Sequence, residues 1–122
     1  MVSFATPETA RLAAGGALQT IGRIGPTELE GLLRGGTARV IDIRGADEWS
    51  AGHIPGAENV PLGEIAEHLA TMRRDEPIVL HCQSGMRSII GASLLQCAGF
   101  ENVRDLHGGI AGWLAAGLPV ER

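Results

Sequence analysis

The stretch Leu80-His81-Cys82-Gln83-Ser84-Gly85-Met86-Arg87-Ser88 marks the point where a predicted strand meets a predicted helix. The apolar run at its start, residues 77–80, predicts a short buried strand. The apolar residues that follow the stretch recur at helical spacing and predict a helix; they are Ile89, Ile90, Leu94, Leu95 and Ala98. Cys82 is therefore expected where a strand ends and a short loop leads into a helix.

This loop favours a reactive form of the Cys82 sulfur. Backbone N–H groups of such a loop, together with the free N–H groups in the first turn of the helix, can point at the sulfur. The helix dipole adds partial positive charge there, and Arg87 adds a full charge nearby. All three effects favour thiolate over thiol, so we expect Cys82 to be a nucleophile at neutral pH.

The composition indicates a single globular domain. The chain has 122 residues, of which 44% are hydrophobic and 20% charged. Its net charge of −4 provides no basic surface for nucleic acid, and its four aromatic residues are too few for base-stacking platforms. We therefore expect no nucleic-acid partner, whereas the oligomeric state is left open.

The two cysteines, Cys82 and Cys97, are predicted to be free thiols. If the second lies ten residues along the helix, it is about 15 Å away, whereas a disulfide needs Cα atoms within about 7 Å. Free thiols suggest a reducing, cytoplasmic setting. No apolar run reaches the roughly 18 residues of a membrane helix, so we expect no membrane segment in this chain. Cys97 follows the apolar pattern of its helix and is expected to pack in the core.

Strands and helices alternate along the rest of the chain. Residues 1–20 are expected to form an N-terminal extension, with a helix that Thr6 can cap and Gly15-Gly16 can end. Residues 21–122 are expected to form one domain. Predicted strands are 38–43, 59–61, 77–80 and 103–106; predicted helices are 26–35, 62–72, 87–98 and 110–116, the last carrying Trp113 inward. This alternation predicts a parallel sheet with helices on both faces.

Several segments in this order resemble the rhodanese family of single-domain sulfurtransferases. The matching segments are 42–44 with Glu48-Trp49, 52–57, 82–88, 98–100, and Gly108-Gly109 with Trp113. The resemblance covers roughly residues 22–120. It implies an α/β fold with three layers, α/β/α, around a central, mostly parallel five-stranded sheet.

The resemblance also implies a mechanism through a persulfide. Cys82 would be the catalytic nucleophile and would take one sulfur from thiosulfate or a persulfide donor. Cyanide or a thiol would then remove that sulfur. Neither a metal nor an organic cofactor is needed. Arg87 would hold the anionic end of the donor, and the remaining substrate-binding positions would be Gln83, Ser84, Gly85, Met86 and Ser88.

One loop position departs from the family pattern. The residue after the cysteine is often basic in this family, and here it is Gln83. This removes one positive charge from the mouth of the loop, although Gln83 and Ser84 can still donate hydrogen bonds. Arg44, after the 38–43 strand, is a further candidate for binding substrate, with a structural role as the alternative.

Other polar residues are expected to be structural. Asp42 and Glu48 are predicted to pair or cap within the turn after the 38–43 strand. His81 is next to Cys82, but adjacent strand residues point to opposite faces, so a Cys–His dyad is not expected. The chain has no CxxC pair and its four histidines lack ligand spacing, so no metal site is predicted.

Two other functions stay open beside sulfur transfer. One is a sulfur carrier or partner-binding module that does not turn over thiosulfate. The other is a phosphatase or arsenate reductase, whose loop also holds an anion between a cysteine and an arginine. By family comparison those enzymes need a longer loop than the four residues that separate Cys82 from Arg87 here.

Overall fold

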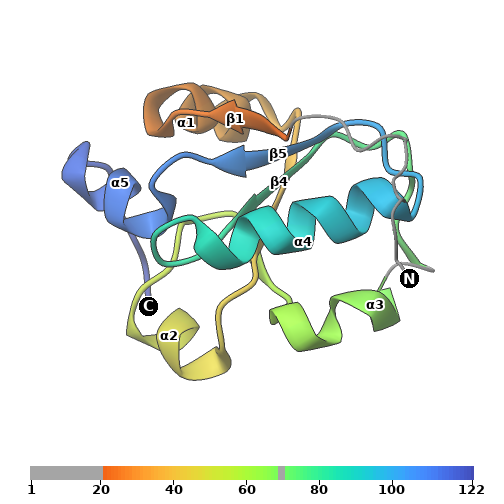
Figure 1. The fold of residues 1–122 in the computed structure, drawn as a ribbon. Coiled ribbons are helices and arrows are strands. Elements are labelled where there is room, and N and C mark those ends of the chain that lie inside the picture. The colour runs from red at the N-terminus through yellow and green to blue at the C-terminus, as the bar shows by residue number, and fades with distance from the viewer. Residues whose placement is uncertain (1–20, 69–70) are drawn as a thin grey trace.

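The computed structural model describes residues 21–68 and 71–122. The predicted helix within residues 1–20 lies outside the described part, as does Leu69 of the predicted 62–72 helix. Strands and helices alternate along the chain (Figure 1). They are β1 (Gly22–Ile24), α1 (Pro26–Gly35), β2 (Arg39–Asp42), α2 (Ala46–Ala51), β3 (Glu58–Asn59), η1 (Leu62–Glu64), α3 (Ile65–His68), β4 (Ile78–His81), α4 (Met86–Cys97), β5 (Val103–Leu106) and α5 (Gly109–Ala115).

The strands form one five-stranded sheet in the order β1-β5-β4-β2-β3. Every strand pair is parallel. From β2 the chain moves outward to β3, whereas from β4 it moves the opposite way to β5. The topological switch point therefore lies between β2 and β4, and α/β proteins place their binding sites beyond the carboxyl ends of the strands at such a point.

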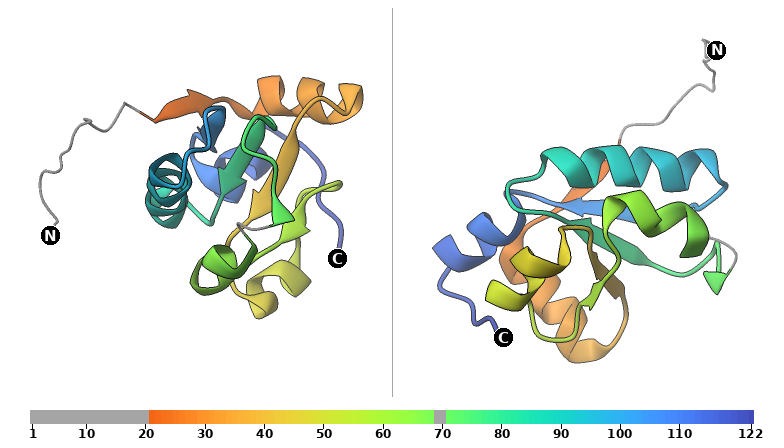
Figure 2. Two further views of the ribbon diagram at one scale, coloured as in Figure 1. Left: turned by 90° about the vertical axis from the view of Figure 1, so that its right-hand side faces the viewer. Right: turned by 90° about the horizontal axis from the view of Figure 1, so that it is seen from below.

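Helices cover both faces of the sheet, as the sequence predicted (Figure 2). Alternate residues of β4 belong to different cores: Ile78 and Leu80 pack in one cluster with Ala92 and Leu95 of α4, and Val79 packs in the other. The second cluster also contains Leu29 of α1 with Ile110 and Trp113 of α5. The fold is thus a three-layer α/β/α arrangement, and β4 is buried on both sides.

The predicted 62–72 helix is shorter in the structure. A 3₁₀ turn, Leu62–Glu64, leads into a single α-helical turn, Ile65–His68. Ile65 and Met72 are still both buried in the same core cluster. The apolar spacing thus reports burial correctly, although the first turn of the predicted helix is 3₁₀ rather than α-helical.

The prediction that Cys97 packs in the core is wrong. The buried side of α4 is formed by Ser88, Gly91, Ala92 and Leu95. Cys97 lies two residues beyond Leu95, about 200° around the helix, and is exposed. Three apolar side chains of α4 are also exposed: Met86 (75%), Ile90 (55%) and Leu94 (48%).

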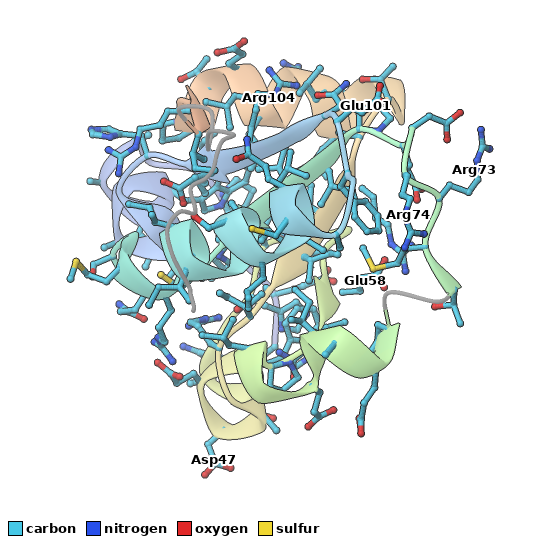
Figure 3. The ribbon with its side chains drawn as sticks, turned by 45° about the vertical axis from the view of Figure 1, so that its right-hand side comes forward. Asp47, Glu58, Arg73, Arg74, Glu101 and Arg104 are labelled. Atoms are coloured by element: carbon cyan, nitrogen blue, oxygen red, sulfur yellow. The ribbon has the colours of Figure 1, made fainter. Side chains whose placement is uncertain are left out.

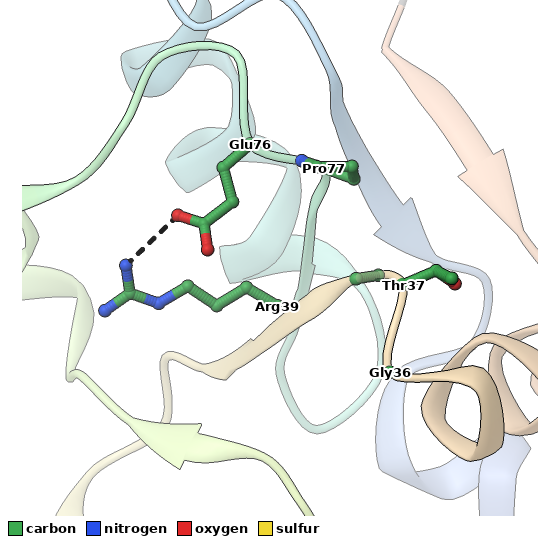
Figure 4. Close-up of a pocket in the computed structure, with 6 residues that line it drawn as sticks. Gly36, Thr37, Arg39, Glu76 and Pro77 are labelled. Atoms are coloured by element: carbon green, nitrogen blue, oxygen red, sulfur yellow. Dashed lines mark hydrogen bonds and ion pairs between the residues drawn. The ribbon is translucent and has the colours of Figure 1, made fainter.

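Charged side chains gather at the amino ends of β2 and β4, away from Cys82. Arg39 forms ion pairs with Glu58 (2.7 Å) and Glu76 (3.4 Å). Figure 4 shows Arg39 and Glu76 at a surface pocket that Pro77 also lines. The guanidinium of Arg74 lies 5.2 Å from the centre of the Phe100 ring. Arg74 is labelled in Figure 3. The pocket beside Arg39 and Glu76 is not lined by a cysteine.

Candidate active site

Cys82 directly follows β4, at the carboxyl edge of the sheet and next to the switch point. Its side chain is 1% exposed, so the sulfur lies inside the loop rather than on the surface. The backbone N–H of Gly85 donates a hydrogen bond to the sulfur at 3.1 Å. Gly85 caps the N-terminus of α4 with φ +109°, a left-handed conformation that favours glycine.

The surroundings of Cys82 favour its thiolate form. Burial of the thiol raises its pKa, but hydrogen bonding with the Ser88 side chain and hydrogen bonds from the backbone N–H groups of Ser88, Gly85 and Ser84 outweigh burial. The pKa of Cys82 therefore lies below its usual value. Hydrogen bonding to the charged form is the physical cause, since such bonds are stronger when the acceptor is an anion.

The start of α5 holds the loop in this orientation. Ile110 donates its N–H to the Cys82 carbonyl (2.9 Å), and Ala111 donates to the Gln83 carbonyl (3.1 Å). Both carbonyls are thereby directed toward α5, which leaves the following N–H groups free to face the sulfur. A Cβ at Gly109 would collide with the Cys82 carbonyl oxygen and lie 2.7 Å from the Gln83 oxygen. The approach of α5 therefore requires glycine at this position.

Arg87 is anchored to α2. Its Nη1 and Nη2 atoms each lie 2.9 Å from a different oxygen of Glu48. Glu48 also accepts the N–H of Gly45 at 3.1 Å, so it caps α2 as well. The hydrogen bond with Arg87 is the main reason why the pKa of Glu48 is lowered to about 2. The predicted structural role of Glu48 thus includes fixing the arginine of the loop.

Arg44 is buried beside Asp42. Its Nη2 lies 2.7 Å from Asp42 and donates to the Gly52 carbonyl at 2.8 Å. Its Nη1 reaches the side-chain oxygen of Gln83 at 3.4 Å. Of the two roles considered for Arg44, this geometry favours the structural one, because its donors already have protein partners and it is 3% exposed.

His81 lies on the side of β4 away from the Cys82 sulfur. Its Nε2 is 3.7 Å from Asp42, and its Nδ1 is 3.4 Å from the Cys82 carbonyl oxygen rather than from the sulfur. Burial lowers the pKa of His81, against an opposing effect of Asp42. The ring is therefore uncharged at neutral pH and is not positioned to take the proton of Cys82.

The outer side of the loop faces solvent. Gln83, Ser84 and Met86 are exposed, Arg87 is half-buried, and Gly85 and Ser88 are buried. The predicted site residues therefore divide into two groups. Gly85 and Ser88 surround the sulfur from inside, and the other four form the mouth through which a donor would approach.

Comparisons with known proteins identify the family of this chain. A family model described as a rhodanese-like domain matches residues 25–116. The chain belongs to this family. The matched range includes every described strand except β1 and all of the loop around Cys82.

Two relatives and one solved structure illustrate the likeness of this rhodanese-like chain to known proteins. An uncharacterized protein of Bacillus subtilis, YqhL, is 37% identical over 76 residues, which are 62% of this chain and 60% of that protein. Thiosulfate sulfurtransferase GlpE of Pseudoalteromonas translucida is 40% identical over 77 residues, 63% of this chain and 73% of that protein. The human single-domain sulfurtransferase TSTD1 is 29% identical, with a TM-score of 0.73 over 79% of this chain and 97% of that chain. The match thus spans less than two thirds of YqhL.

Sequence reasoning missed one buried partner of the rhodanese-like loop. Ser88 donates a hydrogen bond from its hydroxyl to Asp105 of β5, and the same oxygen lies 3.6 Å from the Cys82 sulfur. Asp105 is fully buried. The sequence placed Asp105 only within the predicted 103–106 strand, and no local pattern shows which helix residue it meets.

Among residues 21–68 and 71–122, no group of three histidine, cysteine, aspartate or glutamate side chains could hold a metal ion. Within the same ranges, no helix has the length and apolar character needed to cross a membrane.

Proposed function

We propose that this chain is a sulfurtransferase of the thiosulfate:cyanide (rhodanese) type. It would move sulfane sulfur from thiosulfate or a persulfide donor to cyanide or a thiol, through a persulfide on Cys82. The observation that carries the proposal is the Gly85 N–H, 3.1 Å from the Cys82 sulfur at the N-terminus of α4. Relatives described as sulfurtransferases support it.

In the first step the Cys82 thiolate attacks the outer sulfur of thiosulfate. A new S–S bond forms on Cys82, the S–S bond of thiosulfate breaks, and sulfite leaves with the electron pair. The persulfide that remains is an anion. The N–H groups of Ser84, Gly85 and Ser88 would stabilise this anion as oxyanion-hole donors stabilise a developing negative charge.

In the second step the acceptor removes the outer sulfur. Cyanide, or the thiolate of an acceptor thiol, attacks the outer sulfur of the persulfide. The product is thiocyanate or a new persulfide, and the electron pair of the broken S–S bond returns to Cys82 as thiolate. Two half-reactions that share one covalent intermediate predict ping-pong kinetics.

Arg87 is proposed to bind the anionic end of the donor. Its two contacts with Glu48 occupy one N–H on each terminal nitrogen, and a guanidinium has five N–H donors in total. The remaining donors can therefore bind sulfonate oxygens while Glu48 holds the side chain still. Gln83, Ser84 and Met86 would complete the mouth around the donor, and Arg44 would hold Gln83.

Two alternatives remain to be tested against this proposal. A carrier or partner-binding module would accept sulfur without turning over thiosulfate. A phosphatase or arsenate reductase would use Cys82 on a tetrahedral oxyanion, but only four residues separate Cys82 from Arg87. A loop of this length leaves a small opening, which suits a single sulfur atom better than a phosphate.

We also propose a reducing, cytoplasmic setting for this activity. Cys82 and Cys97 are both free thiols in the structure, and a thiolate nucleophile must stay reduced to react. Residues 21–122 are proposed to act as one rhodanese-like unit, with residues 1–20 as an extension of it. Equal activity of a 21–122 chain and the full chain would support this division.

The decisive experiment is intact mass spectrometry after mixing with thiosulfate. We expect wild type to gain the mass of one sulfur, Cys82→Ala to gain none, and cyanide to remove the gain while thiocyanate appears. No gain with thiosulfate would contradict the thiosulfate reaction. A gain from a persulfide donor without turnover would then favour the carrier, and hydrolysis of an aryl phosphate by the same sample would favour the phosphatase.

A further inference from the structure

A continuous line of polar groups connects the Cys82 sulfur to a buried carboxylate. The Ser88 hydroxyl oxygen lies 3.6 Å from the sulfur and donates a hydrogen bond to Oδ1 of Asp105. Asp105 and Ser88 are both 0% exposed. The three side chains come from three different elements, since Cys82 follows β4, Ser88 is on α4 and Asp105 is on β5.

The carboxylate of Asp105 is only partly compensated. Its Oδ2 atom makes no hydrogen bond with any described residue, and the one ion pair that the same residues form with it is from Nε of Arg23 at 3.4 Å. The Arg23 side chain is 47% exposed and also contacts His107. A buried carboxylate held by one hydroxyl and one partly solvated cation is stabilised less as an anion than a fully hydrogen-bonded one.

The charged or titratable groups that act on Asp105 come from three directions. They are Arg23 on β1, His107 just after β5, and Cys82 at the end of β4, which acts through Ser88. Burial raises the pKa of the Asp105 carboxyl against the opposing effects of Ser88, Arg23 and His107. Asp105 is therefore easier to protonate than an ordinary aspartate.

Ser88 has one hydroxyl proton, so the line of groups has two arrangements with the same net charge. In the first, the thiol donates to the Ser88 oxygen and the Ser88 hydroxyl donates to the Asp105 carboxylate. In the second, the protonated Asp105 donates to the Ser88 oxygen and the Ser88 hydroxyl donates to the Cys82 thiolate. Conversion breaks the S–H bond and the old Ser88 O–H bond, and forms a new Ser88 O–H bond and an Asp105 O–H bond.

We propose that Asp105 is a positioning residue for Cys82. The Asp105 carboxylate takes up the thiol proton of Cys82 inside the protein, through the Ser88 hydroxyl. This inference rests on the proposed role of Cys82 as the nucleophile. The sulfur needs a proton acceptor inside the protein, because Cys82 is 1% exposed to solvent and His81 does not face the sulfur. Asp105 provides the proton acceptor that neither water nor His81 provides.

The test is a pH titration of the thiolate by its ultraviolet absorbance, in a Cys97→Ser background so that one thiol is counted. The chain contains no tyrosine, whose ionisation would overlap with that signal. Two coupled groups lose their protons in two macroscopic steps. We therefore expect wild type to form part of its thiolate in a first step at lower pH and the rest in a second step.

The variants separate this proposal from a purely structural role. Asp105→Asn cannot take up the proton, so the first step should disappear, as it should in Ser88→Ala; Ser88→Thr keeps a hydroxyl and should restore it. The matched control is Asp75→Asn, which changes a fully exposed aspartate that forms an ion pair with Arg73. It should leave both steps unchanged. A single step in wild type, or a first step that survives in Asp105→Asn, overturns the proposal.

A surface substitution keeps the test decisive if Asp105→Asn does not fold. Arg23→Gln removes the positive charge beside Asp105 and should move the first step to higher pH, by up to about one unit, or tenfold in proton affinity. An unshifted first step in this variant contradicts the proposal. Because no sulfur donor is present, failure of sulfur loading with two intact steps would reject the proposed function and not this inference.

Discussion

The guanidinium of Arg87 is held by the carboxylate of Glu48, with two N–H donors each 2.9 Å from a different oxygen. The pair joins α4 to α2 across the mouth of the loop that contains Cys82. Since the pKa of Glu48 is lowered to about 2, the pair stays ionised at any pH suited to an enzyme assay. The orientation of Arg87 therefore depends on a residue from another element.

Glu48→Gln is expected to raise the KM for thiosulfate and to leave kcat nearly unchanged. The variant frees Arg87 without removing it, so the cost is the lost orientation of one partly exposed ion pair, up to about 1 kcal/mol or fivefold in KM. Steady-state kinetics would measure it. Glu58→Gln breaks the similar pair with Arg39 at the other end of the sheet and should leave KM unchanged. A lower KM in Glu48→Gln would instead mean that Glu48 competes with the donor.

Cys82→Ser is expected to abolish sulfur loading with little loss of stability. The serine oxygen can accept the Gly85 N–H and contact Ser88 as the sulfur does, but it is not a nucleophile of comparable reactivity at neutral pH. Intact mass and thermal unfolding of the same sample would measure both effects. Full turnover in Cys82→Ser would show that the proposed persulfide mechanism is incorrect.

Trp113→Ala is expected to lower the free energy of unfolding by about 3–5 kcal/mol, as aromatic truncations in a core do. Trp113 is 2% exposed, and its indole N–H donates to the Pro119 carbonyl at 2.7 Å. Denaturant unfolding followed by circular dichroism would measure the loss. Leu114→Ala changes a neighbouring side chain that is 50% exposed, so a loss of similar size there would argue against core packing as the cause.

Gly109→Ala is expected to destabilise the protein and to disrupt the loop around Cys82. Its φ of +59° is similar to the +65° of Gly36, so alanine adds a similar left-handed strain of about 1–2 kcal/mol at either position. Only at Gly109 does the new Cβ also collide with the Cys82 carbonyl oxygen. Gly36→Ala, whose Cβ would meet nothing within 4 Å, is therefore the matched control. Equal melting temperatures and equal loading in the two variants would refute the proposed contact.

His81 is expected to make stability depend on pH. Burial lowers the pKa of His81 below 6.5 in the folded protein, so the unfolded chain binds a proton there first. The free energy of unfolding must then fall as the pH drops below about 6.5. His81→Gln should reduce the fall in melting temperature between about pH 7 and about pH 5. The control variant is His68→Gln, which changes a partly exposed histidine on α3. An unchanged slope in His81→Gln would assign the pH dependence elsewhere.

The parts of the fold that sequence reasoning predicted correctly are those with a strong local signal. β4 is mostly apolar and buried throughout, β2 has the buried apolar pair Val40-Ile41 at its centre, and α1 ends at Gly35 as predicted. β1 was not predicted as a strand, because only one of its three residues is buried and it forms by pairing with β5. The residue pattern of one segment does not show which other strand will pair with it, so an edge strand such as β1 cannot be predicted from that pattern alone.

The same distinction applies to the site. The position of Cys82 in a loop before a helix follows from a local pattern, and the structure places the Gly85 N–H on its sulfur. The partners of the loop, Glu48 and Asp105, lie 39 residues from Arg87 and 17 residues from Ser88 in the chain. Which carboxylate meets which donor depends on how α2 and β5 pack, so spacing within the sequence could not predict these pairs.

The sulfur of Cys82 accepts hydrogen bonds from backbone N–H groups and lies next to the hydroxyl of the inward-facing Ser88, whereas Gln83, Ser84 and Met86 direct their side chains to solvent. Reactivity and donor choice therefore depend on different atoms of the same loop. Substitutions at the three outer positions can change which sulfur compound is accepted without altering how the nucleophile is activated. Such a loop allows new substrate preferences to evolve, or to be engineered, one exposed side chain at a time.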